Sequence, residues 1–404
     1  MEYIEGGVTA AEGFSASGLH CGIRKNKTKP DLALIFSDRE SSAGAVYTQN
    51  LVKGAPIAVT KENIADGKAR AIICNSGIAN TCAPDGIEKA REMCAIAAQV
   101  LGLLPTDIVV ASTGVIGPSL PTEPIRIAAP ALKDALSPTG SLMAATAIMT
   151  TDTFPKEAAV MVGIGGKKVK IGGIAKGSGM IHPNMATMLS FMTSDCAISP
   201  EMLQKAIKQA ADRTYNMISV DGDTSTNDTF LVLANGAAGN PEISAEGADF
   251  ETFAAGLEAV ARKLAKMLAR DGEGATKLLT VRVEGAPDLD TARTVARSVS
   301  ASSLFKSAMF GNDANPGRIL CAIGYAGVYV DVDKIDVTFR SVKGQEMVCQ
   351  AGMVMDFSEE HALEVISQPE VETLIDLHMR AISAEAYGCD LTYDYVKINA
   401  DYRS

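Results

Sequence analysis

Short apolar runs that end in polar turns alternate with helical segments along this 404-residue chain. Residues 31–36 and 69–74 each become apolar and then meet a polar turn, which predicts two buried strands. Residues 158–163 and 168–173 flank Gly165-Gly166, which predicts a hairpin. Because hairpins occur together with helices, the order of elements predicts a layered α/β or α+β fold. It disfavours a simple doubly wound nucleotide-binding fold.

Helical periodicity and capping residues place several further elements. Ile87 to Leu101 repeat apolar residues at three- and four-residue steps before Gly102, and Ser199-Pro200 is typical of a helix start. The strand at residues 108–112 is expected to deliver Thr113 and Gly114 to a loop at its carboxyl end, a common position for functional groups. Other helices are expected at residues 253–268 and 291–309, and strands at 279–283, 337–339 and 391–395.

Composition excludes several classes of partner. The formal net charge is −11 and the chain has no Trp, so nucleic acid and anionic membranes are disfavoured. No apolar stretch of 18 or more residues suggests a membrane span, and the acidic N-terminus does not resemble a signal peptide. The eight cysteines show no C-x-x-C or zinc spacing, so we expect reduced thiols, no metal and a cytoplasmic protein.

The segment Lys176-Gly-Ser-Gly-Met-Ile-His-Pro-Asn-Met-Ala-Thr-Met-Leu189 holds the candidate nucleophile. Thr187 follows Ala186 at the end of a loop containing glycine and proline. A threonine hydroxyl needs a neighbouring base, and cleavage of the Ala186–Thr187 bond would supply the new α-amine of Thr187 for that purpose. The pKa of such an amine is about 7.7–8.0, so it is partly neutral near physiological pH. An ordinary half-buried strand threonine is the structural alternative.

This segment closely resembles the region around the nucleophile of the ornithine acetyltransferase family, the glutamate N-acetyltransferases of arginine biosynthesis. The resemblance extends along nearly the whole chain, in order, through six further motifs. They are Cys74-Asn-Ser-Gly-Ile-Ala-Asn80, Ser112-Thr-Gly-Val-Ile-Gly117, Ile148-Met-Thr-Thr-Asp-Thr153, Ser219-Val-Asp-Gly-Asp-Thr-Ser-Thr-Asn-Asp-Thr229, Arg270-Asp-Gly-Glu-Gly-Ala-Thr-Lys277 and Gly311-Asn-Asp-Ala-Asn315.

The resemblance implies a role for particular residues. Thr113 and Gly114 match the family's oxyanion pair, which stabilises the tetrahedral intermediate through a hydroxyl and a backbone N–H. The family's substrate-binding positions fall on Thr150, Lys176, Thr187, Glu273, Asn399 and Ser404. Lys176 would supply a charge for a substrate carboxylate, and Glu273 an acceptor for the ornithine ammonium group.

The implied fold is that of the ornithine acetyltransferase group, an α/β sandwich with N-terminal-nucleophile-type chemistry. Self-cleavage would yield an alpha chain, residues 1–186, and a beta chain, residues 187–404. The two would be intertwined as one structural unit, because a strand beginning at Thr187 would pair with strands of the first half. Two alpha and two beta chains would form a heterotetramer.

The implied reaction is ping-pong transfer of an acetyl group from N-acetylornithine to glutamate through an acetyl-threonine intermediate. No cofactor is required, although acetyl-coenzyme A is an alternative acetyl donor in a bifunctional enzyme. The nearest rival is an N-terminal-nucleophile aminopeptidase or amidohydrolase, in which water replaces glutamate. An uncleaved amino-acid-binding protein is a second rival. His182 precedes Pro183 and is interpreted as a residue that shapes the loop.

Overall fold

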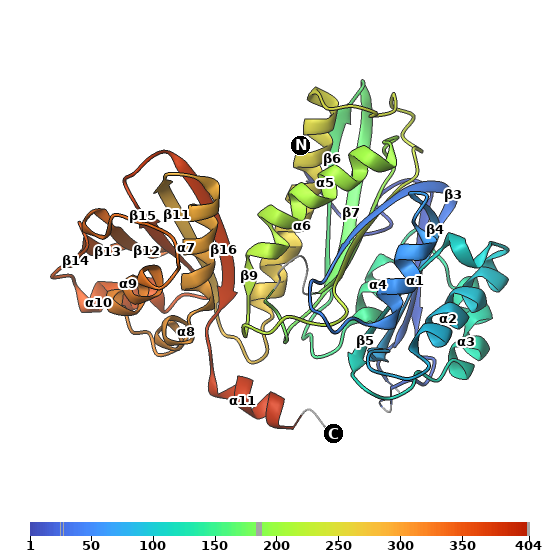
Figure 1. Ribbon diagram of the computed structural model, residues 1–404, viewed down its shortest axis with the longest axis horizontal. Helices are drawn as coiled ribbons and strands as arrows, with labels where there is room; N and C mark the ends of the chain where they lie inside the picture. Colours follow the sequence, from blue (N-terminus) through green and yellow to red (C-terminus); the bar gives the residue numbers. More distant parts are fainter. Residues whose placement is uncertain (25, 27, 183–187, 402–404) are drawn as a thin grey trace. The chain divides into compact units, whose positions relative to one another are not determined.

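The structure is a computed structural model that describes residues 1–24, 26, 28–182 and 188–401 (Figure 1). It forms two compact units. Unit 1 contains residues 1–177, 183–216 and 224–264, and unit 2 contains residues 178–182, 217–223 and 265–404, each within the described part of the chain. Both units therefore combine chain from before and after position 187.

The described part of unit 1 is built on a nine-stranded mixed sheet in the order β1-β6-β7-β8-β10-β3-β4-β5, with β2 paired to β3. The pairs β4–β5 and β8–β10 are parallel, and the other pairs are antiparallel. The strands are β1 (Glu2–Ile4), β2 (Phe14–Leu19), β3 (Leu32–Tyr47), β4 (Lys68–Ile78), β5 (Ile108–Val115), β6 (Lys156–Ile164), β7 (Lys167–Lys176), β8 (Leu189–Ser194) and β10 (Thr229–Ala234).

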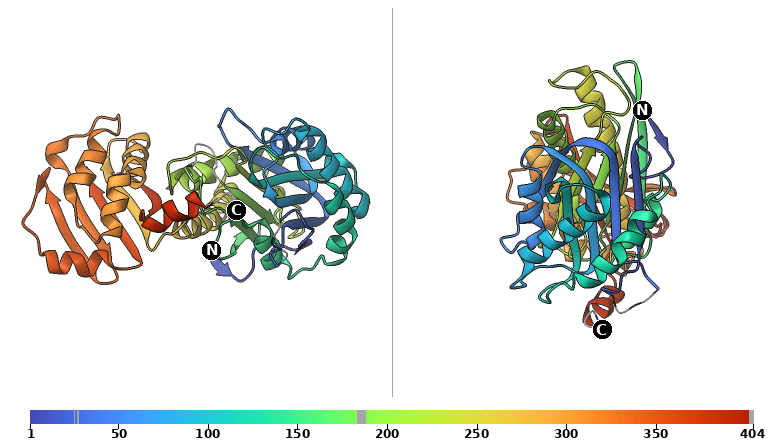
Figure 2. Two further views of the ribbon diagram at one scale, coloured as in Figure 1. Left: turned by 90° about the horizontal axis from the view of Figure 1, so that it is seen from below. Right: turned by 90° about the vertical axis from the view of Figure 1, so that its right-hand side faces the viewer.

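Helices cover both faces of this sheet. Helices α1, α2 and α3 pack on one face of β3, β4 and β5, and α4 packs on the other (Figures 1 and 2). The helices of this part are α1 (Ala55–Asn63), α2 (Gly86–Leu101), α3 (Glu123–Asp134), α4 (Ser141–Ile148), α5 (Pro200–Arg213) and α6 (Ala248–Arg270), with short 3-10 turns η1 (Pro105–Asp107) and η2 (Tyr215–Met217). The last turns of α6 belong to unit 2.

The alternation of side chains along β3 explains why this sheet is covered on both faces. Leu32 and Leu34 belong to the core under α1–α3, whereas Ala33 and Ile35 belong to the core that includes α4. Successive residues of a strand point to opposite faces, so a continuous apolar run requires cover on both sides.

The described part of unit 2 holds a seven-stranded sheet in the order β14-β13-β12-β15-β11-β16-β9. Its strands are β9 (Ile218–Ser219), β11 (Leu278–Ala286), β12 (Asp336–Ser341), β13 (Gly344–Gln350), β14 (Met353–Val354), β15 (Glu370–Asp376) and β16 (Ile382–Cys389). Helices α7 (Leu289–Ala301), α8 (Ser303–Phe310), α9 (Pro316–Gly324), α10 (Glu359–Ile366) and α11 (Tyr393–Ala400) and the 3-10 turn η3 (Val332–Lys334) complete it. An apolar cluster that includes Val281, Val295 and Phe339 is part of its core.

Several sequence predictions are confirmed. The mixed α/β fold has layered sheets, and β6 and β7 form the predicted hairpin, with positive φ angles at Gly165 and Gly166. Ser199 caps α5 by accepting a hydrogen bond from the Met202 N–H. Helix α2 ends at Gly102 in the left-handed conformation, as glycine permits.

Two element boundaries were predicted incorrectly. The strand that begins at Leu32 does not end at Ser37 but continues to Tyr47 through a register shift between Phe36 and Ser41. The helix expected over residues 291–309 is divided at Ser302, whose extended backbone interrupts it and whose side chain caps α8. A capping residue inside an apolar pattern can thus start a second helix.

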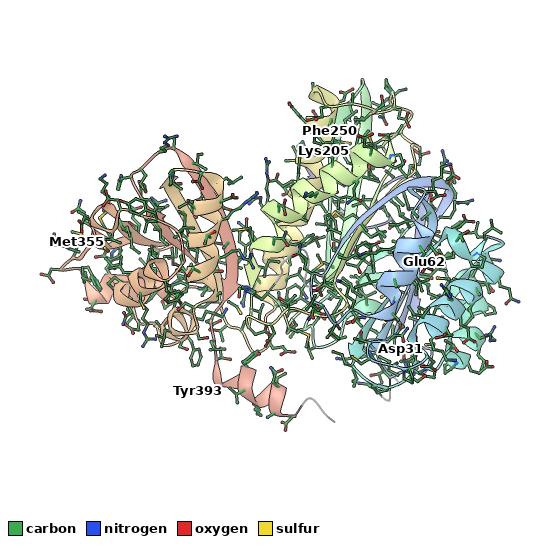
Figure 3. All side chains as sticks on the ribbon, in the orientation of Figure 1. Asp31, Glu62, Lys205, Phe250, Met355 and Tyr393 are labelled. Atoms are coloured by element: carbon green, nitrogen blue, oxygen red, sulfur yellow. The ribbon has the colours of Figure 1, made fainter. Side chains whose placement is uncertain are left out.

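The predicted last strand at residues 391–395 is wrong, because Tyr393 begins helix α11 instead. Tyr393, which is labelled in Figure 3, is 84% exposed. Its ring makes an edge contact with the ring of Phe310. The alternation of Leu391, Tyr393 and Tyr395 therefore does not reflect one buried strand face. Among the described residues, no helix has the length and apolarity that crossing a membrane requires.

Candidate functional site

Thr113 and Gly114 lie near the end of strand β5, where they pair with Ser76 and Gly77 of β4. They are thus part of the sheet ladder and not of a loop after it, which corrects the expected position. Gly114 has a φ of +131°, and a Cβ atom there would overlap the Gly77 carbonyl group and lie 2.6 Å from the Ile78 nitrogen. Only glycine fits this close approach of two backbones.

Lys176, the last residue of β7, reaches the same place. Its Nζ donates a hydrogen bond of 3.3 Å to Thr113 Oγ1, and the residue is only 8% exposed. Burial lowers the pKa of this ammonium group, and the charge of Asp152 opposes that shift. The structure therefore brings together two residues, Thr113 and Lys176, that are 63 positions apart in the sequence.

Asp152 organises the residues next to Lys176, and sequence reasoning missed it. Its carboxylate accepts hydrogen bonds from the Gly177 N–H (2.7 Å), the Thr150 N–H (2.9 Å) and Lys156 Nζ (2.8 Å). Burial disfavours its ionised form, but the charges of Lys176 and Lys156 outweigh burial and hold its pKa at about 2. Thr150 thus joins this cluster through its backbone. An isolated acid within a threonine-rich motif was the available signal.

Asp228 is a second buried acid of unit 1. It is 2% exposed, and its Oδ2 atom has no hydrogen-bond partner among the described residues. Burial raises its pKa well above the usual range, against the opposing effects of a Ser225 hydrogen bond and the Lys176 charge. The next residue, Thr229, donates its N–H to the Met188 carbonyl, so Asp228 directly precedes the contact with the start of β8.

Asn227 connects the end of β5 to the segment after β4. Its Nδ2 donates to the carbonyls of Ala79 (2.5 Å) and Ser112 (2.9 Å), and its Oδ1 accepts from the hydroxyls of Thr81 and Thr226, both at 2.6 Å. This buried amide therefore uses both donors and both acceptor positions. Because Ser112 immediately precedes Thr113, Asn227 restrains the backbone that carries the predicted oxyanion pair. Sequence reasoning gave this asparagine no role.

Glu273 and Asn399 come together within unit 2. Asn399 Nδ2 donates to Glu273 Oε2 at 2.8 Å, and Glu273 is 8% exposed. The Glu273 N–H donates to the Ser178 carbonyl, and a Cβ atom at Gly179 would collide with the Glu273 carboxylate. The absence of a side chain at position 179 therefore makes room for this carboxylate, which retains acceptor capacity beyond the asparagine contact.

The two ring nitrogens of His182 face Arg297 and Ser219 within unit 2. Arg297 approaches its Nε2 at 3.1 Å and Ser219 Oγ lies 3.0 Å from its Nδ1. Because a guanidinium only donates, Nε2 must accept, which leaves the Nδ1 hydrogen for Ser219. Burial, followed by the Arg297 charge, lowers the pKa of His182 and favours this neutral form.

Three predicted residues fall outside the described part of the chain: Ala186, Thr187 and Ser404. Their assigned roles, as the cleavage site, nucleophile and substrate contact, stay predictions.

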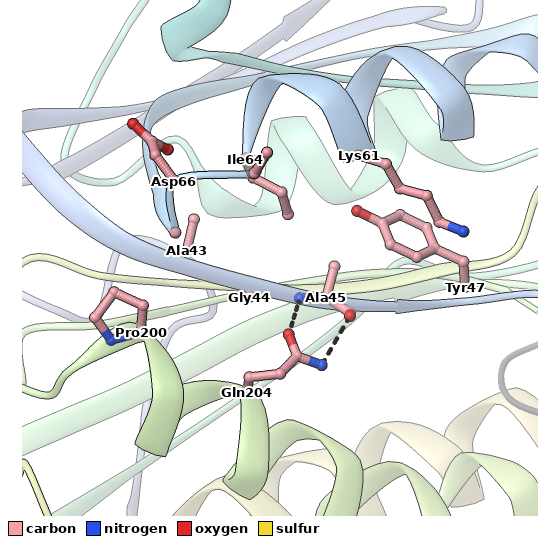
Figure 4. Close-up of a pocket in the computed structure, with 11 residues that line it drawn as sticks. Ala43, Gly44, Ala45, Tyr47, Lys61, Ile64, Asp66, Pro200 and Gln204 are labelled. Carbon is pink, nitrogen blue, oxygen red and sulfur yellow. Dashed lines mark hydrogen bonds between the residues drawn. The ribbon is translucent and has the colours of Figure 1, made fainter.

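A cavity of about 360 Å³ in unit 1 lies between β3, α1 and α5 (Figure 4). The Gln204 side-chain amide at its edge is hydrogen-bonded to the backbone N–H and carbonyl of Ala45, and the Lys61 ammonium lies 5.0 Å from the centre of the Tyr47 ring. None of the predicted site residues that the structure describes lines it. We therefore centre the candidate site on Thr113 and Lys176.

These observations define a class of protein. It has a mixed α/β fold with layered sheets, and it holds a buried cluster of charged side chains at the end of a strand. The ArgJ family profile matches residues 15–404 of the chain. The chain belongs to this family.

Two relatives match the chain over its full length. The "Arginine biosynthesis bifunctional protein ArgJ" of Symbiobacterium thermophilum is 50% identical over 406 residues, which cover 100% of both chains. The protein of the same name from Caldanaerobacter subterraneus is 47% identical over 405 residues, again covering 100% of both chains. A solved structure of the "Arginine biosynthesis bifunctional protein argJ" from Bacillus halodurans has 42% identity and a TM-score of 0.50, and the match covers 52% of this chain and 97% of that one.

Proposed function

We propose that this chain is an acetyltransferase of arginine biosynthesis that transfers the acetyl group of N-acetylornithine to glutamate. Membership of the ArgJ family and full-length similarity to bifunctional arginine biosynthesis proteins support this function. The observation that carries the chemistry is the placement of Thr113 and Gly114 at a strand end, with a buried lysine on the threonine hydroxyl. Such an arrangement suits a developing oxyanion, which needs donors that are already oriented.

The proposed reaction has two half-reactions on Thr187. Its hydroxyl attacks the acetyl carbonyl, its own α-amine accepts the hydroxyl proton, and Thr113 and Gly114 donate to the oxyanion. The carbon–nitrogen bond then breaks, ornithine leaves with the proton on its amine, and the acetyl group remains as an ester on Thr187. The amine of glutamate attacks this ester, which gives N-acetylglutamate and restores the hydroxyl.

The remaining predicted residues would hold the substrates. Thr150 and Lys176 are proposed substrate contacts, as are Asn399 and Ser404. The Glu273 carboxylate is proposed to accept a hydrogen bond from the side-chain ammonium of ornithine, which its buried position would strengthen. Acetyl-coenzyme A is proposed as a second acetyl donor, which would account for the word bifunctional in the names of the relatives.

Maturation by cleavage of the Ala186–Thr187 bond is part of the proposal. The match to the Bacillus halodurans structure covers nearly all of a chain about half as long as this one, as expected for a separated alpha or beta chain. The mature enzyme is proposed to be a cytoplasmic heterotetramer of two alpha chains, residues 1–186, and two beta chains, residues 187–404.

The deciding experiment combines a denaturing gel, N-terminal sequencing and an acetyl balance. We expect two fragments, with Thr187 at the new N-terminus, and one N-acetylglutamate formed for each ornithine released. The Thr187→Ala variant should remain a single inactive chain. Release of free acetate in place of N-acetylglutamate would instead identify an amidohydrolase, and one intact chain without transfer activity would contradict the proposal.

A further inference from the structure

The contact between Lys176 and Thr113 has a defined direction. An ammonium group donates hydrogen bonds and cannot accept them, so Thr113 Oγ1 must accept from Lys176 Nζ. The hydroxyl hydrogen of Thr113 then points away from the lysine and is available to another acceptor. An oxyanion requires a hydrogen-bond donor of this kind, whose hydrogen is already oriented and points away from the lysine that holds the hydroxyl.

The surroundings of Lys176 supply positive charge at this hydroxyl. Lys176 is 8% exposed, and Lys156, which is fully buried, also faces the Asp152 carboxylate. Asp152 is already bonded to Lys156 Nζ, the Gly177 N–H and the Thr150 N–H, so its acceptor positions are shared among several donors. Two lysine side chains therefore surround one strongly acidic carboxyl, in a place where water screens charge poorly.

We propose that Lys176 is a positioning residue for the oxyanion: it orients and polarises the Thr113 hydroxyl, whether or not the substrate carries a carboxylate. This inference rests on the proposed function. It differs from the substrate-carboxylate contact that the family resemblance implies, because it acts through the Thr113 hydroxyl on any acetyl group that Thr187 attacks.

An acetyl donor without a carboxylate separates the two roles. We would measure the burst of p-nitrophenolate from p-nitrophenyl acetate in the wild type and in Lys176→Met and Lys176→Gln, with Lys168→Met as control. Lys168 is an exposed lysine on the same strand, β7. The burst amplitude counts cleaved active sites, so each rate constant is normalised to mature enzyme even when maturation is slow.

The expected order of acetylation rates is wild type, then Lys176→Gln, whose neutral amide still donates, then Lys176→Met. The Met variant should lose about 10- to 100-fold, less than the 10²–10³-fold typical for complete loss of an oxyanion donor. In a Thr113→Val background, the Lys176→Met substitution should add less than about threefold, because the hydroxyl through which the lysine acts is absent. Lys168→Met should match the wild type.

Two results would overturn the inference. Wild-type acetylation rates in Lys176→Met, together with a raised KM for N-acetylornithine, would make Lys176 a carboxylate-binding residue only. Equal losses from Lys176→Met in the wild-type and Thr113→Val backgrounds, that is, full additivity of the two substitutions, would show that the lysine does not act through Thr113. Failure of the proposed function is scored separately in the wild type. Free acetate in place of N-acetylglutamate would show hydrolysis and not transfer, and the absence of both a burst and an acetyl group on the Thr187 peptide would show that no acetyl-threonine forms.

Discussion

Removal of the Asn227 side chain should lower both stability and turnover. Asn227→Ala deletes the amide that donates to the Ala79 and Ser112 carbonyls and accepts from two threonine hydroxyls. A buried group that loses its partner costs about 1–3 kcal/mol. The two hydroxyls can rotate toward each other, since Thr81 and Thr226 already lie 3.4 Å apart. The two carbonyls then dominate the loss, and we expect a decrease of about 2–6 kcal/mol in the free energy of unfolding.

The same substitution should loosen the predicted oxyanion pair. Asn80 and Cys82, in the segment after β4, adopt left-handed backbone conformations, which raise the conformational energy of residues other than glycine. Loss of the Ala79 contact would remove a restraint on this segment, and loss of the Ser112 contact would remove one next to Thr113. We expect kcat for acetyl transfer to fall by about 10-fold or more, with a smaller change in KM, because the donors are needed most in the transition state.

Urea unfolding measured beside steady-state kinetics tests this reasoning. Asn240→Ala is a matched control, because Asn240 is also a buried asparagine of unit 1 bonded to backbone, at Ala197 and Pro241. It should lower stability and leave the kcat of the folded, cleaved enzyme near that of the wild type. A stability change in Asn227→Ala below about 0.5 kcal/mol, the low end for a single hydrogen bond, would refute the estimate. Equal kcat losses in both variants would refute the specific link to Thr113.

Four further outcomes are expected. Thr113→Ala, tested in fully cleaved protein, should lower kcat about 10²–10³-fold, whereas a raised KM with near-normal kcat would assign Thr113 to substrate binding. Gly114→Ala should disturb the β4–β5 pairing, because its methyl group would overlap the Gly77 carbonyl, and should be seen as a lower melting temperature together with a loss of activity. The pH–rate profile should rise with deprotonation of the Thr187 α-amine, whose reference pKa is about 7.7–8.0, and undiminished activity near pH 5 would exclude an amine base. Burial raises the pKa of Asp228, so the folded protein binds the carboxyl proton more tightly than the unfolded chain does, and stability is lost as pH rises toward the folded pKa. In urea unfolding, Asp228→Asn should therefore be more stable than the wild type at about pH 8, and the difference should shrink toward about pH 4. A difference in stability that stays constant over this pH range would contradict this reasoning.

The local elements were largely readable from the sequence, because their causes are local. The hairpin of β6 and β7 follows from two glycines with positive φ angles, and α5 follows from the Ser199 cap and Pro200. The prediction from the sequence was wrong where a local pattern is compatible with two kinds of secondary structure. The apolar alternation from Leu391 predicted a strand, whereas Tyr393 begins a helix whose own surface is mostly exposed. The periodicity of apolar residues cannot distinguish a strand from a helix when so few residues show the pattern.

The identity of the candidate site residues could also be predicted, since motifs in order along the chain name Thr113, Gly114 and Lys176. Their partners could not. The roles of Asp152 and Asn227 depend on the tertiary structure, which brings β5, β7 and the segment before β10 together. In the sequence, a carboxylate or an amide looks the same whether it is solvated or hydrogen-bonded to several buried groups. The chemistry of Lys176 was likewise decided by tertiary structure: burial and the position of Asp152 set its charge environment, and the Thr113 hydroxyl it contacts lies 63 residues away.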